Sequence, residues 1–207
     1  FKVTEEMCTK AVKEAKESEK GKKILAALET ERKFLQSAGK DGSRCSAPSD
    51  ECICLADFNK RAKAEGTPEA SGTGAFTWRK RRISLFYDQL NRESVVSRDL
   101  GQFYLHELIH SYDYCRELLP GVGTTCEQAA CSEIRAYSLG GGCEEGGYLR
   151  HPDETEPQCV FRSAAESVNM IPKCKDKGGS KYVRDMWVAC RKDQNPIKES
   201  PDASAKG

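Results

Sequence analysis

The N-terminal part of the chain, residues 2–38, has apolar residues three or four positions apart among many Lys and Glu residues, a pattern that predicts amphipathic helices. Gly21 is predicted to interrupt this region and Gly39 to end it. Thr4 is predicted to cap the first helix, because a Thr side chain accepts hydrogen bonds from free backbone N–H groups. The apolar positions of the second helix are expected to face the core: Ile24, Leu25, Leu28, Phe34 and Leu35.

The middle of the chain has a different pattern. Residues 39–75 are rich in Gly, Ser, Pro and Ala and are predicted to be irregular, with a flexible loop at "GTPEASGTG". The following segment, "AFTWRKRRISLFYDQL", alternates apolar and polar residues and predicts a strand or hairpin. Ile83, Leu85 and Tyr87 are expected on one face of it.

Helical spacing returns after this segment, and it predicts helices at residues 94–118, 124–139, 157–170 and 178–192. The pattern therefore predicts an α+β fold that is mostly helical, with a small strand or hairpin region. We expect three parts along the chain: a helical segment packed on the core (1–38), a main domain (39–195) and a disordered tail (196–207).

The charge balance argues against several classes of protein. The chain of 207 residues has 33 Lys and Arg residues against 32 Asp and Glu residues, so no excess of charge favours binding to nucleic acid. No apolar run approaches the roughly 18–20 residues that span a bilayer. Because the chain begins at Phe1 rather than at Met, we expect that an upstream segment has been removed.

Cysteine is the most unusual feature of the composition. The chain has 11 Cys residues and lacks the C-x₂-C pairs of zinc ribbons. Apart from Cys52 and Cys54, the cysteines are scattered from end to end, which predicts disulfides that stabilise the fold in an oxidising compartment. Because the number is odd, at least one thiol is expected to be free or to pair with a partner.

The segment "FYLHELIHSYDYC" predicts a metal site. His106 and His110 are four residues apart, so a helix projects both imidazoles from one face toward one ion, the arrangement that zinc requires. Glu107 lies about 100° around the helix, where it can take a proton from the water that zinc activates. The chain has only 3 His residues, which argues against a chance match. His151, the third, is expected to be exposed.

A catalytic zinc ion usually has three protein ligands, so one more is expected. Glu133 in "CSEIRA" is preferred, because it lies on the next predicted helix and can return to the metal. Asp113 is the rival, one turn beyond His110, where it is better placed to orient an imidazole. Glu127 is the third candidate. Ser132 and Arg135 are expected to flank the site.

Three blocks carry a family resemblance: "LHELIHSYDYCR", "ACSEIRAYSLGGGC" and "CVFRSAAESV". They closely resemble the mitochondrial inner membrane metalloproteases of the ATP-twenty-three type. Weaker similarity in the cysteine-bearing N-terminal half extends the match to roughly Cys8 through Pro196. The chain departs from the family pattern in "ELLPGVGTTCEQ" between the first two blocks, at Phe86 where a Cys is expected, and at Cys126, which is additional.

The resemblance implies that residues 39–195 form a zincin-like metalloprotease domain that uses Zn²⁺. It also implies peripheral association with the mitochondrial inner membrane on its intermembrane-space side, where disulfides are installed. The implied substrate is a polypeptide such as subunit a of ATP synthase.

Two functions follow from these observations. The first is a zinc endopeptidase in which His106, His110 and Glu133 bind the metal and Glu107 is the general base. The alternative is a non-proteolytic chaperone or assembly factor for inner-membrane subunits of ATP synthase, in which the disulfide-linked fold binds the subunits and cleavage is dispensable.

Overall fold

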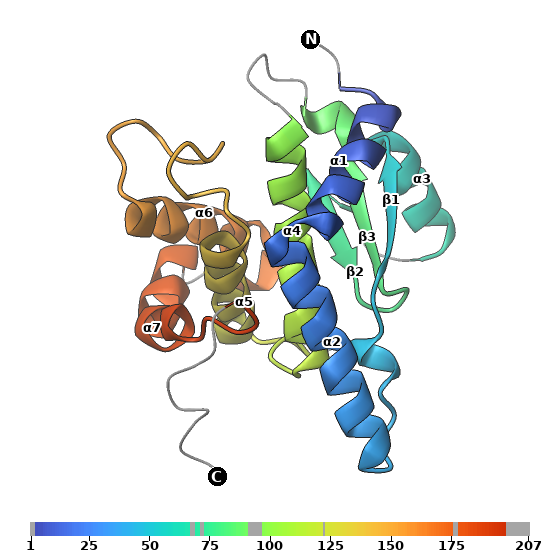
Figure 1. Ribbon diagram of the computed structural model, residues 1–207. Helices are drawn as coiled ribbons and strands as arrows, with labels where there is room; N and C mark the ends of the chain where they lie inside the picture. Colours follow the sequence, from blue (N-terminus) through green and yellow to red (C-terminus); the bar gives the residue numbers. More distant parts are fainter. Residues whose placement is uncertain are drawn as a thin grey trace.

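The computed structural model describes residues 3–66, 69–70, 73–90, 97–121, 123–175 and 178–197. It has seven α-helices and one three-stranded sheet in these residues. The N-terminal helices and the sheet lie on one side of helix α4, and the C-terminal helices lie on the other side (Figure 1). The predicted α+β class with mostly helical content is confirmed.

The first two helices are α1 (Glu5–Glu17) and α2 (Glu19–Ser37). Thr4 caps α1 as predicted, since its side chain accepts a hydrogen bond from the Met7 N–H. The predicted break at Gly21 is wrong, because the chain breaks at Ser18, whose side chain caps α2 by accepting from the Gly21 N–H. Gly21 allows a close approach instead: a Cβ there would lie 2.0 Å from the Ala15 carbonyl oxygen.

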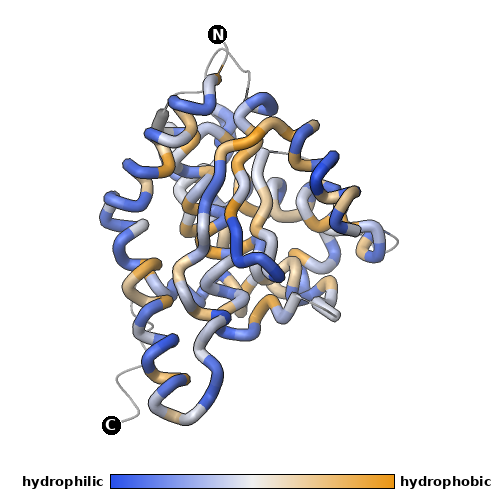
Figure 2. The backbone as a smooth tube through the Cα atoms, turned by 90° about the vertical axis from the view of Figure 1, so that its right-hand side faces the viewer, coloured by the Kyte–Doolittle hydropathy of each residue, from blue (hydrophilic) through white to orange (hydrophobic). Residues whose placement is uncertain are grey.

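Most of the predicted apolar face of α2 is correct. Ile24 and Leu28 are fully buried, and Leu25 and Leu35 pack partly buried against the core. Phe34 is wrong, because its side chain is 65% exposed. Along the helices, hydrophobic and hydrophilic residues alternate from turn to turn (Figure 2).

Residues 39–75 are more ordered than the sequence indicates. They contain a 3₁₀ turn η1 (Ser43–Cys45), strand β1 (Ser49–Ile53) and helix α3 (Leu55–Ala64). The prediction of an irregular segment is therefore wrong for residues 43–64, while residues 67–68 and 71–72 of the predicted flexible loop lie outside the described residues. Strand β1 is paired in parallel with a strand far along the chain, a contact that local composition does not reveal.

The alternating segment forms the predicted hairpin. Strands β2 (Gly74–Thr77) and β3 (Arg82–Phe86) pair antiparallel, and the sheet order is β1-β3-β2. Ile83 and Leu85 are buried on the face toward α4, while Tyr87 lies just past the strand in the 3₁₀ turn η2 (Tyr87–Leu90). Phe86, where the family pattern predicts Cys, is buried against Phe58 of α3.

The predicted C-terminal helices are all present: α4 (Ser97–Cys115), α5 (Cys126–Leu139), α6 (Glu156–Met170) and α7 (Gly179–Lys192), with a 3₁₀ turn η3 (Pro172–Cys174) between the last two. Among the described residues, no helix is both long enough and apolar enough to cross a membrane. The predicted tail lies outside these residues from 198 onward, and Ile197 packs partly buried against the core. The three-part division of the chain stays a prediction.

Two hydrophobic clusters organise the fold. The N-terminal core joins α1, α2, β3 and α4 around residues such as Ile24, Leu85 and Leu108. The C-terminal core joins α5, α6 and α7 around residues such as Ile134 and Val160. Helix α5 also reaches the N-terminal core through Ala136 and Leu139, so the cores meet along α4 and α5.

The cysteines form five disulfides, and Cys54 keeps a free thiol. The pairs are Cys8–Cys52, Cys45–Cys115, Cys126–Cys174, Cys131–Cys190 and Cys143–Cys159. The prediction of structural disulfides with an odd thiol left over is confirmed. Cys126, additional to the family pattern, joins the start of α5 to η3.

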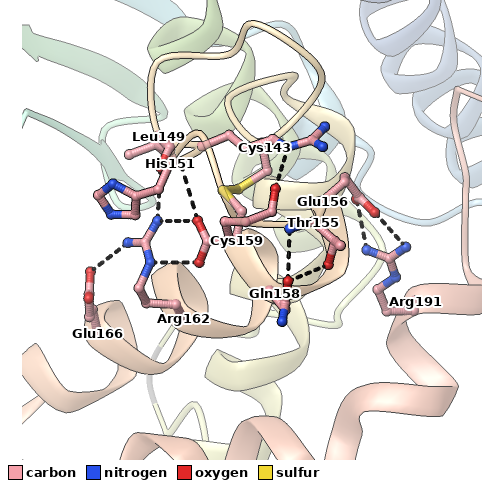
Figure 3. The surroundings of a disulfide bond; sticks show 12 residues. Cys143, Leu149, His151, Thr155, Glu156, Gln158, Cys159, Arg162, Glu166 and Arg191 are labelled. Carbon is pink, nitrogen blue, oxygen red and sulfur yellow. Dashed lines mark hydrogen bonds and ion pairs between the residues drawn. A yellow bond between two sulfur atoms is a disulfide. The ribbon is translucent and has the colours of Figure 1, made fainter.

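The loop between α5 and α6 is fastened by one of these disulfides. Cys143 in the loop is bonded to Cys159 in the first turn of α6 (Figure 3). Beside it, Arg162 donates to the Leu149 carbonyl at 2.8 Å and to the Glu154 carboxylate at 2.9 Å. These bonds restrain the loop that carries Tyr148 and Leu149, two residues that line the main cleft of the structure.

Candidate metal centre

Three predicted ligand residues meet between α4 and α5. The Nε2 atoms of His106 and His110 are 3.0 Å apart, and each lies 3.5 Å from a different oxygen of the Glu133 carboxylate. The side chains are only 11%, 11% and 17% exposed. Helix α4 positions the imidazoles on one face, and α5 returns antiparallel to bring Glu133 opposite them.

The donor set fits a divalent cation. His106, His110 and Glu133 each offer one ligand atom, and these atoms lie within 4.8 Å of one another. Two imidazole nitrogens and a carboxylate oxygen are the ligand types that zinc takes in catalytic sites. Among the described residues, the Oε2 atom of Glu133 is buried with no hydrogen-bond partner, which fits an oxygen that would ligate a cation.

The electrostatics of the two imidazoles differ. Burial disfavours charge on both, but at His106 the contact with Glu133 outweighs burial and raises the pKa. At His110 burial prevails, and the neighbouring His106 adds to it, so that the pKa falls to about 4. His110 is therefore neutral at physiological pH, the state in which an imidazole ligates a metal.

The rival ligands take other roles. Asp113 is fully buried and accepts hydrogen bonds from Ser132 and Arg135, each at 2.9 Å, so it does not join the three converging groups. Burial raises the Asp113 pKa, against the effect of Arg135. Glu127 is exposed in the first turn of α5, and His151 is exposed as expected. Ser132 and Arg135 lie beside the site as predicted.

Glu107 lies on the wall of the same cleft, next to strand β2. Burial raises the pKa of its carboxyl to about 7, and the Glu133 charge adds to the rise. His106 and a hydrogen bond from the Phe76 backbone N–H act in the opposite direction. A carboxyl with a pKa near neutrality both accepts and returns a proton readily, as a general base and acid must.

A cleft of about 550 Å³ opens over these groups. Thr73 and the strand β2 residues Gly74, Ala75 and Phe76 line the cleft. Apolar side chains from other elements also line it: Phe103, Leu119, Ala129, Tyr148, Leu149, Met170 and Ile171.

Close helix packing makes the centre possible. Gly140, the residue after α5, lies where a Cβ would be 3.1 Å from the His106 backbone nitrogen and 2.8 Å from the Ala136 carbonyl oxygen. Any larger residue would push the end of α5 away from α4. Gly140 thus sets the distance between the two helices that carry the candidate ligands.

Two residues of the site were missed by the sequence analysis. The Tyr137 ring packs 4.4 Å from the His106 ring, centroid to centroid, and its hydroxyl is 2.8 Å from the Ser167 hydroxyl of α6. Ser167 also hydrogen-bonds Glu133. Tyr137 is four residues beyond Glu133, so helical spacing could have identified it. Ser167 comes from a helix that gives no such signal.

Two histidines and a glutamate on one helix, faced by a carboxylate from the next helix beside an edge strand, are groups suited to metal-assisted hydrolysis. The chain belongs to the Peptidase M76 family, whose profile matches residues 6–198. The family resemblance seen in the HELIH and CSEIRA blocks is thereby confirmed.

Several fungal proteins are similar in sequence to this chain. The mitochondrial inner membrane protease atp23 of Emericella nidulans is 36% identical over 100 residues, which are 45% of this chain and 41% of that protein. Those of Aspergillus clavatus and Vanderwaltozyma polyspora are 36% and 35% identical over 101 residues, covering 42% and 39% of their lengths. The matched part thus spans less than half of these relatives. No solved structure matches the chain.

Proposed function

We propose that this chain is a zinc-dependent endopeptidase. The observation that carries the proposal is the convergence of His106, His110 and Glu133 in a cleft that also contains Glu107. The first three would hold zinc, and Glu107 would act as general base. Family membership supports hydrolysis of peptide bonds, and the ligand types support zinc.

Zinc, when bound, supplies Lewis-acid polarisation of the substrate carbonyl and increases the acidity of water. The Glu107 carboxylate accepts the proton of the attacking water and returns it to the departing amine. Its place between β2 and His106 lets it reach a substrate that lies along the strand.

Strand β2 indicates how a polypeptide is held. It pairs with β3 on one side only, and its other side faces the cleft, where no described strand pairs with it. An extended peptide can add to such an edge through backbone hydrogen bonds. Its scissile bond would then pass over Glu107 and the three ligands, which favours an unfolded or extended segment as substrate.

We further propose peripheral association with the mitochondrial inner membrane, on the intermembrane-space side. The relatives are mitochondrial inner membrane proteases, which supports this membrane, and the five disulfides suit an oxidising compartment. A subunit of ATP synthase such as subunit a is the substrate that the family resemblance implies. The alternative, an assembly factor that does not cleave, is not favoured, because the three candidate ligands and Glu107 all lie in one cleft.

The purified chain is expected to cleave an extended polypeptide, because it places a complete set of hydrolytic groups along an open strand edge. Cleavage of an unfolded fluorogenic protein should stop after treatment with a chelator and return with stoichiometric Zn²⁺. Bound metal is measured in parallel by elemental analysis. Cleavage that persists in metal-free protein would contradict the proposal.

The pH dependence follows from Glu107. A general base must be ionised, and its pKa is about 7 in the metal-free site. Protonation below the pKa removes the base, so kcat/KM is expected to fall about tenfold per pH unit on the acid side. A bound cation favours the ionised carboxylate and places this limb at or below pH 7. Rates measured from pH 5 to 9 check it, and an acid limb that survives in Glu107→Gln would contradict the assignment.

A further inference from the structure

The surroundings of the two histidines are unequal. The Nδ1 atom of His110 is 2.8 Å from the Ser132 hydroxyl oxygen, whereas the Nδ1 atom of His106 is buried with no hydrogen-bond partner among the described residues. The His106 ring is instead held by packing against Tyr137. Among the described residues, therefore, only His110 of these two has a hydrogen bond at its Nδ1 atom to orient the ring.

The hydrogen bond of His110 is the first in a buried series of hydrogen bonds. Ser132 donates to one oxygen of Asp113 at 2.9 Å, and Arg135 donates its Nε–H to the other oxygen at 2.9 Å. All three residues are essentially inaccessible to solvent, at 1%, 0% and 1% exposure. Bulk solvent therefore does not reach these three side chains to replace a missing partner.

The direction of these hydrogen bonds determines which nitrogen of the His110 imidazole carries the proton. The guanidinium is always charged and can only donate, so its buried partner Asp113 acts as an acceptor. The Ser132 proton then points to Asp113, and the Ser132 oxygen is left to accept from Nδ1–H of His110. This tautomer leaves Nε2 of His110 with its lone pair free, on the atom that faces His106 and Glu133.

The two terminal nitrogens of the Arg135 guanidinium bind the segment that follows α7. Its Nη2 donates to the Asn195 carbonyl at 2.6 Å, and its Nη1 donates to the backbone carbonyl of Asp193 and lies 2.9 Å from the Asp193 carboxylate. Arg116, just past α4, donates to the same carboxylate at 2.9 Å. Residues 193–195, which follow α7, are thereby connected to His110 through one guanidinium.

We propose that Ser132, Asp113 and Arg135 are positioning residues that set the His110 tautomer, and that residues 193–195 complete this network. The inference rests on the proposed function to the extent that His110 is a metal ligand. A purely structural ion pair is the competing interpretation of Arg135 and Asp113. Such a pair would stabilise the core without needing Ser132 between it and an imidazole. The unbroken path from His110 to Asn195 favours positioning.

The first test removes one hydroxyl. In Ser132→Ala, zinc affinity measured by chelator competition is expected to fall 10–100-fold, as it does when partners of ligating histidines are lost. Ser163→Ala is the matched control, because Ser163 is also a buried helical serine, 3% exposed, whose hydroxyl has no described hydrogen-bond partner. The Co²⁺-loaded proteins give a second readout, since their ligand-field spectra report the orientation of the ligands.

The second test measures the tautomer in metal-free protein. The chain has 3 His residues, so the imidazole ¹⁵N signals can be assigned with single variants. Wild type is expected to show His110 as the Nδ1–H form, and Ser132→Ala to show a mixture. The opposite tautomer in wild type overturns the proposal. Because no metal is needed, this result stands apart from the proposed function, which fails if wild type binds no zinc.

The third test concerns the C-terminal segment in the full chain. Asp193→Ala removes the carboxylate that contacts both Arg116 and Arg135. It is expected to weaken zinc binding and change the Co²⁺ spectrum in the same direction as Ser132→Ala. Asp185→Ala on the exposed face of α7 is the matched control. Unchanged zinc affinity and spectrum in both Ser132→Ala and Asp193→Ala, with folding intact, would overturn the proposal while leaving the peptidase assignment in place.

Discussion

Replacing Glu107 with Gln is expected to lower kcat for polypeptide cleavage by about 10²–10⁴-fold, the usual contribution of a general base, and to leave one zinc ion bound. The amide has nearly the same shape as the carboxylate but cannot accept the proton of water. The Glu107 side chain contacts the cleft wall at β2 rather than the converging ligand atoms, so the metal ligands are undisturbed.

The measurement pairs cleavage rates with zinc content in the same preparations. Glu117→Gln is the control, since Glu117 lies just beyond α4 with its side chain 74% exposed. Its cleavage rate should equal that of wild type. Full cleavage by Glu107→Gln at normal zinc content would remove Glu107 from the mechanism. Loss of zinc in that variant would make it a ligand instead.

Replacing Glu133 with Gln is expected to reduce zinc affinity by on the order of 10² or more. Zinc sites with four ligands bind with roughly 10–16 kcal/mol, so the share of one ligand is about 3 kcal/mol. Glu133 is the only one of the three converging groups that carries a full negative charge, and its removal leaves two neutral imidazoles. Cleavage should be lost in parallel with the metal.

The controls for this variant are the carboxylates that the sequence offered as rivals. Glu127→Gln, at the exposed start of α5, should bind zinc as wild type does. Asp113→Asn is expected to weaken binding less than Glu133→Gln, because Asp113 acts through Ser132. Affinities in the reverse order would make Asp113 the third ligand.

The local pattern predicted the convergence of His106, His110 and Glu133 better than it predicted the elements of the N-terminal half. The i, i+4 spacing of His106 and His110 fixes their geometry as soon as a helix forms, and the strong periodicity around them makes that helix predictable. The preference for Glu133 needed only that two consecutive helices return antiparallel. These are short-range inferences, and the structure brings the three residues together.

The misses depended on contacts between distant segments. Strand β1 pairs with β3, more than 30 residues away, and its own composition indicates a loop. The break at Ser18 arises because the start of α2 packs against the end of α1, where only Gly21 fits. Phe34 follows the apolar periodicity of α2 but lies where the helix extends past the core. Disulfide partners were equally unreadable, since eleven cysteines allow very many pairings.

The distribution of the disulfides bears on the order in which this protein matures. All eleven cysteines lie in the described residues, and none of the five bridges joins the N-terminal core to the C-terminal core. Each half can therefore complete its own oxidation without the other. Two candidate ligands, His106 and His110, belong to the N-terminal half, and Glu133 belongs to the C-terminal half. The candidate metal centre is therefore complete only when the two halves pack together. Oxidation of the two halves alone therefore does not assemble the candidate metal centre.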